Sequence, residues 1–245
     1  MSSEIREFYD KFRKGIMIRA VATILFSVVC FCRMDAQFEG IVETRNLTTD
    51  ELGSMQRFTT IMWIKKDRIR VQNTAFGNTP ATTLIYRNDR HIIWMLNETD
   101  KTYFEMLQEE KPQGPESGRE PSLEDKPSIG KTGRTKKILG YACEQVLLTR
   151  AEGETEIWGT KQLADLEATV AKVLGESGAE GGGWMEEVAV LGLYPLASST
   201  RIEGKIVESQ ETTRIEVKDL SSDLFDLPPG FRKQSMGDVR DPPHE

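Results

Sequence analysis

Short runs of β-branched and aromatic residues, separated by polar turns, constrain the fold of this chain more than any other feature. Residues 68–71 (RIRV) alternate, with Ile69 and Val71 on one face, and residues 97–101 (NETDK) predict a hairpin turn into the strand that begins near Tyr103. Successive short strands joined by polar turns favour an antiparallel meander. Strands are expected at residues 38–42, 57–66, 68–71, 82–86, 91–96, 103–106, 138–143, 145–149, 154–159, 196–203 and 205–217.

Only residues 160–175 show a clear helical pattern. Leu163, Leu166, Val170, Val173 and Leu174 recur at helical spacing, and a glycine run at residues 181–183 follows. A second short helix is expected at residues 184–191. These two helices are the expected cover of the concave face of the sheet. The predicted fold class is mainly β (α+β): a curved antiparallel sheet, or half-open β-barrel, with one or two helices covering its concave face.

The domain boundaries follow from composition. Residues 108–137 contain Pro112, Pro115, Pro121 and Pro127 and few apolar side chains, so they predict a flexible insert that buries too little surface to offset its ordering entropy. We expect one domain over residues 37–236, with this insert inside it, and a loose tail over residues 237–245.

Residues 1–36 are expected to be a cleaved export signal. The apolar run 20–32 (AVATILFSVVCFC) is shorter than the roughly 20 residues that a membrane-spanning helix needs, and basic residues precede it. Cleavage near Ala36 predicts a periplasmic or secreted product. Membrane contact is expected only before cleavage, through the signal itself. A retained anchor and lipid attachment at Cys30 are the alternatives, and either Met1 or Met17 is the start.

Charge and residue usage narrow the classes of function. The chain has 39 acidic and 32 basic side chains, a net charge of −7, which disfavours nucleic acid as a partner. After cleavage Cys143 is the single thiol, expected to be a buried apolar residue, with a nucleophile as the alternative. His91 and His244 are the two histidines, so we expect no metal site, no cofactor and no catalytic residues.

Apolar side chains between sheet and helices are the candidate ligand contacts. This surface is either packed core or a cavity for an apolar ligand. Tryptophan combines a large apolar ring with one polar group, and the helix stripe faces the same space. The cavity-lining candidates are Trp63, Trp94, Trp158, Trp184, Leu166 and Val170.

Several motifs resemble an exported bacterial family of unknown function, domain-of-unknown-function family 4412. They are residues 140–163 (GYACEQVLLTRAEGETEIWGTKQL), the start 37–40 (QFEG), the hairpin ending 101–103 (KTY) and the closing 224–231 (LFDLPPGF). That family is similar in fold to the periplasmic lipoprotein carrier LolA and receptor LolB. The resemblance implies a half-open antiparallel barrel with helices partly closing an apolar cavity, and it implies no activity.

Two functions follow as hypotheses. The first is an exported, non-enzymatic binding protein that shelters a lipid, a lipoprotein acyl chain or another apolar ligand between sheet and helices. The alternative is a cell-envelope protein–protein interaction module with no small-molecule ligand, which recruits its partner through strand edges or the long insert. An envelope hydrolase ranks last, because no catalytic site can be assembled from these residues.

Overall fold

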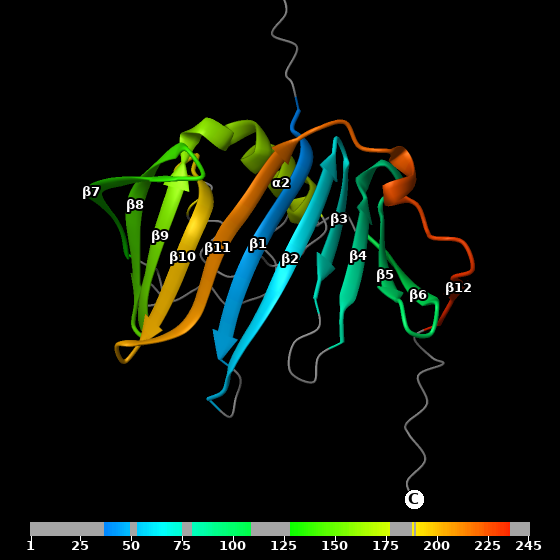
Figure 1. The fold of residues 1–245 in the computed structure, drawn as a ribbon, viewed down its shortest axis with the longest axis horizontal. Coiled ribbons are helices and arrows are strands. Elements are labelled where there is room, and N and C mark those ends of the chain that lie inside the picture. The colour runs from blue at the N-terminus through cyan, green and yellow to red at the C-terminus, as the bar shows by residue number, and fades with distance from the viewer. Residues whose placement is uncertain are drawn as a thin grey trace, which may run out of the picture. The chain divides into compact units, whose positions relative to one another are not determined.

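A computed structural model describes residues 37–49, 53–74, 80–108, 128–176, 188 and 190–235 (Figure 1). They form one curved 12-stranded sheet in the order β12-β6-β5-β4-β3-β2-β1-β11-β10-β9-β8-β7. Neighbouring strands are antiparallel, except that β12 pairs in parallel with β6. This confirms the predicted fold class, a mainly β protein with a curved, open sheet and a helix. No helix in these ranges is long and apolar enough to cross a membrane.

The described elements follow one another along the chain in this order. The first six strands are β1 (Glu39–Thr49), β2 (Met55–Lys65), β3 (Arg68–Asn73), β4 (Thr82–Arg87), β5 (Ile92–Asn97) and β6 (Thr102–Leu107), with the 3₁₀ turn η1 (Asn88–Arg90) before β5. Then come β7 (Ser128–Ile138), β8 (Tyr141–Arg150), β9 (Gly153–Thr160), η2 (Lys161–Leu163), α2 (Ala164–Glu176), β10 (Tyr194–Ile202), β11 (Lys205–Val217), η3 (Ser222–Phe225) and β12 (Arg232–Lys233).

The predicted helix and the predicted hairpin are confirmed. The Thr160 hydroxyl accepts a hydrogen bond from the Gln162 amide at 3.2 Å and so caps the helical segment that η2 begins and α2 continues. In the turn between β5 and β6, the Asn97 side-chain oxygen accepts bonds from the amides of Thr99 and Asp100. Most of the second expected helix, 184–191, lies outside the described residues. Val188, which is described, is helical.

The predicted flexible insert is wrong for residues 128–137, which belong to strand β7. β7 pairs with β8 from Ser128 to Ile138, with an irregularity between Lys131 and Thr135. Every residue of β7 before Ile138 is exposed, so main-chain hydrogen bonds to β8 hold the strand instead of buried side chains. The apolar alternation that identifies a strand is therefore absent. Residues 109–127 lie outside the described ranges.

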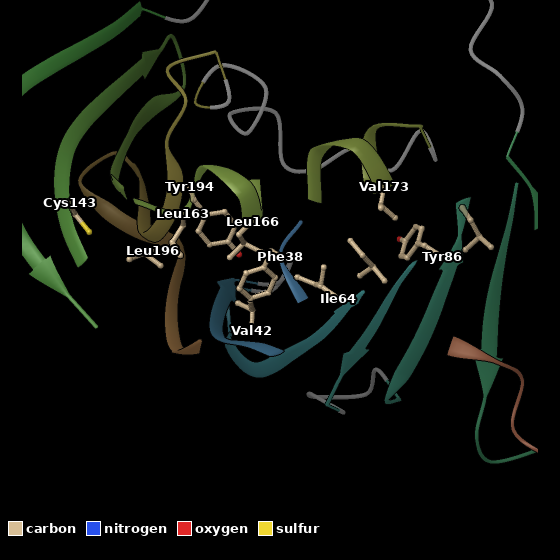
Figure 2. Packing of buried hydrophobic residues seen from close by; sticks show 12 residues of the cluster. Phe38, Val42, Ile64, Tyr86, Cys143, Leu163, Leu166, Val173, Tyr194 and Leu196 are labelled. Atoms are coloured by element: carbon tan, nitrogen blue, oxygen red, sulfur yellow. The ribbon is translucent and has the colours of Figure 1, made fainter. Parts of the chain in front are cut away.

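α2 covers one face of the sheet, which we call the helix-covered face. Leu166 and Val173 of α2 are fully buried against Val42, Ile64 and other apolar side chains of the strands. Figure 2 shows Val173 above Tyr86, and Leu166 close to Phe38 and Val42. Hydrophobic burial between helix and sheet is therefore the main stabilising contact on this face.

The opposite face of β1–β6 is covered as well, by residues 218–231 near the C-terminus. Leu220 and Phe225 are buried there against Ile41, Ile85 and Trp94. In Figure 1 this orange segment, with η3, runs beside β4 and β5. From the sequence, helices are expected over the concave face, and no cover is predicted for the opposite face. The double cover explains why β5 (IIWMLN) is apolar on both faces.

Candidate ligand-binding face

The part of the helix-covered face nearest α2 is packed core. Ile64, Ile69, Tyr86 and Ile93 form a buried row across β2 to β5, each directly opposite the next. Leu166 is 0% exposed, and Val170 is a partly buried neighbour of the same cluster. These two candidate contacts therefore lie at the helix–sheet interface.

A second row on the same face is only half-buried. We call it the apolar row, and its side chains are paired one after another across five adjacent strands, β2 to β6. Since side chains two positions apart on a strand share a face, this row lies next to the buried row under α2. Its members are Met62, Val71, Leu84, Met95 and Phe104.

A polar row borders the apolar row on its other side. The Thr60 hydroxyl donates to the Asn73 side-chain oxygen at 2.7 Å, and Asn46 donates to the Thr60 hydroxyl at 2.9 Å. Asn73 in turn donates to the Thr82 hydroxyl at 3.4 Å. The face therefore changes from buried apolar through half-exposed apolar to hydrogen-bonded polar side chains. This arrangement suits a ligand with an apolar chain lying across the strands.

Trp63 and Trp94 do not lie on the helix-covered face. Trp63 follows Met62 of the apolar row, and Trp94 precedes Met95. Because neighbouring residues of a strand point to opposite faces, both tryptophans lie on the other face, beneath the C-terminal cover. Arg70 lies over the Trp63 ring at 5.8 Å, and the Trp94 indole donates to Glu105 at 2.9 Å. The structure thus separates these two candidates from Leu166 and Val170.

Trp158 lies on β9, at the edge of the cluster that includes Cys143 and Leu196. Its ring is half-buried beneath the ammonium group of Lys136, 4.1 Å from the ring centroid, and its indole donates to Glu156 at 2.6 Å. Trp184 lies outside the described residues. Ligand contact by the six candidates stays a prediction. Three of them, Trp158, Leu166 and Val170, lie in the same core cluster beneath α2.

Cys143 is a buried free thiol, 1% exposed. Burial raises its pKa, which disfavours the thiolate that a nucleophile needs. His91 occupies a left-handed turn, with φ at 54°, immediately before β5. Within the described ranges, no three histidine, cysteine or carboxylate residues are placed to hold a metal ion.

The apolar row itself was not predicted from the sequence. Ile69 and Val71 were correctly placed on one face, yet the row appears only when five strands are aligned in register. In the sequence, the apolar row corresponds to apolar residues that lie the same number of positions before and after each hairpin turn between β2 and β6. Met62, Val71 and Leu84 pack against the core cluster beneath α2. Met95 and Phe104 belong to neither of the two clusters that flank this part of the sheet.

This arrangement defines a class of protein: a curved, open antiparallel sheet with one helix against one face and a C-terminal segment against the other. The chain belongs to the family described as Domain of unknown function (DUF4412), whose model matches residues 38–231. No curated protein matches this chain in sequence.

Solved structures similar to the chain include LolA superfamily proteins. An uncharacterized conserved protein from Thermus thermophilus has 8% identity and a TM-score of 0.45, over 82% of this chain and 94% of that one. The LolA superfamily protein NE2245 from Nitrosomonas europaea has 8% identity and a TM-score of 0.32, over 78% and 91% of the two chains. PNGF-II has 13% identity and a TM-score of 0.38, over 80% of this chain and 31% of that one.

Proposed function

We propose that this chain is an exported, non-enzymatic binding protein that shelters an acyl chain or another apolar ligand against the apolar row. The observation behind this proposal is the row itself. Met62, Val71, Leu84, Met95 and Phe104 form a continuous, partly buried line beside the buried helix interface. Two of them are methionines, whose flexible thioether side chains adapt to apolar ligands of varied shape.

The dimensions and energetics of the row fit a long acyl chain. Five strands spaced about 4.8 Å apart give a row about 19 Å long. Each methylene group removed from water contributes about 0.8 kcal/mol, so contact along part of the row is enough for useful affinity. The polar row at Thr60, Asn73 and Thr82 offers hydroxyl and amide groups to a ligand's polar end.

Export completes the proposal. Residues 1–36 are the expected signal, and cleavage near Ala36 leaves Gln37, two residues before β1 begins. The product is then released into the periplasm or the medium, where a lipid or a lipoprotein acyl chain needs shelter from water.

Protein–protein interaction in the cell envelope is the second candidate function. The observation that favours it is the exposed edge strand β7, to whose outer edge no strand pairs in the described part of the chain. An extended segment of a partner can add to such an edge through main-chain hydrogen bonds. Lys131, Arg134, Lys136 and Lys137 on β7 oppose this, because edge lysines commonly prevent strand addition.

Leu84→Gln tests the proposed ligand site. Leu84 is the centre of the apolar row, and a polar side chain there is expected to weaken binding of 11-(dansylamino)undecanoic acid about 10-fold, the effect of losing roughly 1.4 kcal/mol of apolar contact. Fluorescence titration measures the affinity, and competition with dodecanoic acid confirms that the acyl chain is recognised.

Leu107→Gln is the matched control. Leu107 is 75% exposed on β6, and its position opposite Ile92 places it away from the apolar row. Its affinity for the probe is expected to equal that of the unmodified protein. Equal binding by both variants and the parent, or no saturable binding at all, would count against the acyl-chain proposal and leave the interaction module ahead.

A further inference from the structure

The charged residues of β1 to β6 are confined to one face of the sheet. Because side chains alternate between the two faces of a strand, the positions on the helix-covered face follow from the paired residues of the apolar row. Every position of these six strands on that face is uncharged, whereas the opposite face includes Arg68, Arg70 and Glu105 among its charged residues. The chain as a whole is 29% charged, so composition does not explain the separation.

Burial explains the lack of charge only for the row under α2. Thr60, Asn73 and Thr82 of the polar row are half-buried, and so is Arg70 on the opposite face. A half-buried position of this sheet can therefore accommodate a charged side chain, since long charged side chains extend their polar ends to water. The polar row is thus uncharged at positions where burial does not require it.

The polar row is a directional chain of hydrogen bonds that extends from β1 to β4. Asn46 donates to Thr60, and Thr60 donates to Asn73. Asn73 donates in turn to Thr82. Among the described residues, these bonds leave the hydroxyl hydrogen of Thr82 and one N–H of the Asn73 amide as donors. They leave a second lone pair on each of the Thr60 and Asn73 oxygens as acceptors. The row therefore offers donors and acceptors side by side.

A row with both donors and acceptors matches a hydroxyl group, which donates and accepts at once. A carboxylate or phosphate only accepts, so it would lie against the lone pairs of Thr60 and Asn73 without a counter-charge. An ammonium group only donates, and it too would lack a counter-charge on this face. Removing either charge from water without a partner is costly. A head group with hydroxyls is therefore expected to bind here better than a charged one.

We infer that the ligand of the apolar row has an uncharged head group with hydroxyls, such as glycerol or a sugar, and that the polar row selects it. This inference rests on the proposed function, in which an acyl chain lies along the apolar row. The polar row runs beside it, two residues away on each strand, or about 7 Å. Thr82 ends the hydrogen-bond chain and lies two positions from Leu84, the centre of the apolar row. Thr82 is therefore the main specificity-determining residue.

Calorimetric titration with three ligands of similar chain length tests the inference without any substitution. The ligands are decyl glucoside, decanoate and decylammonium, each used at neutral pH below its critical micelle concentration. Decyl glucoside is expected to bind about 10-fold more tightly than either charged ligand, because its hydroxyls pair with the polar row and no charge is removed from water.

Thr82→Val removes the last hydroxyl of the chain with little change of shape. It is expected to weaken binding of decyl glucoside about 5-fold, the effect of one lost hydrogen bond, and to leave decanoate binding unchanged. Thr82→Lys is expected to reverse the preference in favour of decanoate, because it places an ammonium group beside the head group. Thr59→Val is the matched control, since Thr59 is a half-buried threonine on the opposite face of β2, and all three affinities should stay the same.

The outcomes separate the head-group inference from the proposed function. Equal affinities of the parent protein for the three ligands, or tighter binding of a charged one, would overturn the inference and leave the acyl-chain proposal in place. No saturable binding of any of the three would overturn both. Leu84→Gln should weaken all three ligands alike, whereas the Thr82 variants should change their order. Unchanged order in both Thr82 variants would show that the polar row does not select the head group.

Discussion

Phe225→Ala is expected to lower the free energy of unfolding by about 3–5 kcal/mol, the usual cost of removing a fully buried phenylalanine ring. Phe225 is 0% exposed and packs with Leu220, Ile85 and Trp94 between the C-terminal cover and the sheet. The change leaves a cavity beneath η3 and removes the largest apolar contact of residues 218–231. Urea unfolding followed by tryptophan fluorescence measures the loss.

Val217→Ala is the control for this variant. Val217 is also apolar and immediately precedes the C-terminal cover, yet it is 75% exposed, so its truncation is expected to cost less than about 0.5 kcal/mol. A loss at Phe225 no larger than that at Val217 would mean that the C-terminal segment is not part of the core.

Asp89→Asn is expected to lower the free energy of unfolding by about 3 kcal/mol, because it leaves a buried guanidinium group without its main counter-charge. Arg87 is 2% exposed and donates to both carboxylate oxygens of Asp89, at 2.8 and 2.9 Å. Its other nitrogen donates to the Phe225 carbonyl at 3.0 Å and to the Asp226 carboxylate. Arg87 thereby joins β4 to the C-terminal cover.

The effect of Asp89→Asn depends on pH. The hydrogen bonds from Arg87 lower the pKa of Asp89, against the opposing effect of burial. The stabilisation is therefore complete above the ordinary aspartate pKa of about 3.9 and is lost as pH falls further, through the lowered value. The variant is expected to show a shallower loss of stability below about pH 4 than the parent protein. Asp219→Asn, at an exposed position without an ion pair among the described residues, should reproduce the parent curve.

The strands and the helix that could be predicted are those that contribute apolar side chains to a packed face. In β3 (RIRVQN) Ile69 and Val71 alternate with polar residues, and β5 (IIWMLN) is a short run that is apolar on both faces. In α2 the apolar residues recur at helical spacing. β7 could not be predicted in the same way, because its residues up to Lys137 are exposed on both faces. A strand that buries none of its side chains leaves no apolar pattern in its sequence.

The C-terminal cover was missed for a different reason. The motif at residues 224–231 was noticed as part of a family resemblance, but its role depends on Arg87, which lies 138 residues before Phe225. Such a distant contact leaves no local pattern. The cover also explains why Trp63 and Trp94 are not on the helix-covered face. They were chosen as candidates by residue type, but their positions along β2 and β5 direct them to the face beneath the C-terminal cover.

The central claim, a bound apolar ligand, is tested most directly by native mass spectrometry of the protein purified from the periplasm, before and after extraction with organic solvent. The account predicts a mature chain that begins at Gln37 with an additional lipid-sized mass, which extraction removes. It also predicts that Leu84→Gln retains less of this mass than Leu107→Gln. A bare chain in every sample, with no mass gained on incubation with dodecanoic acid, would contradict the claim.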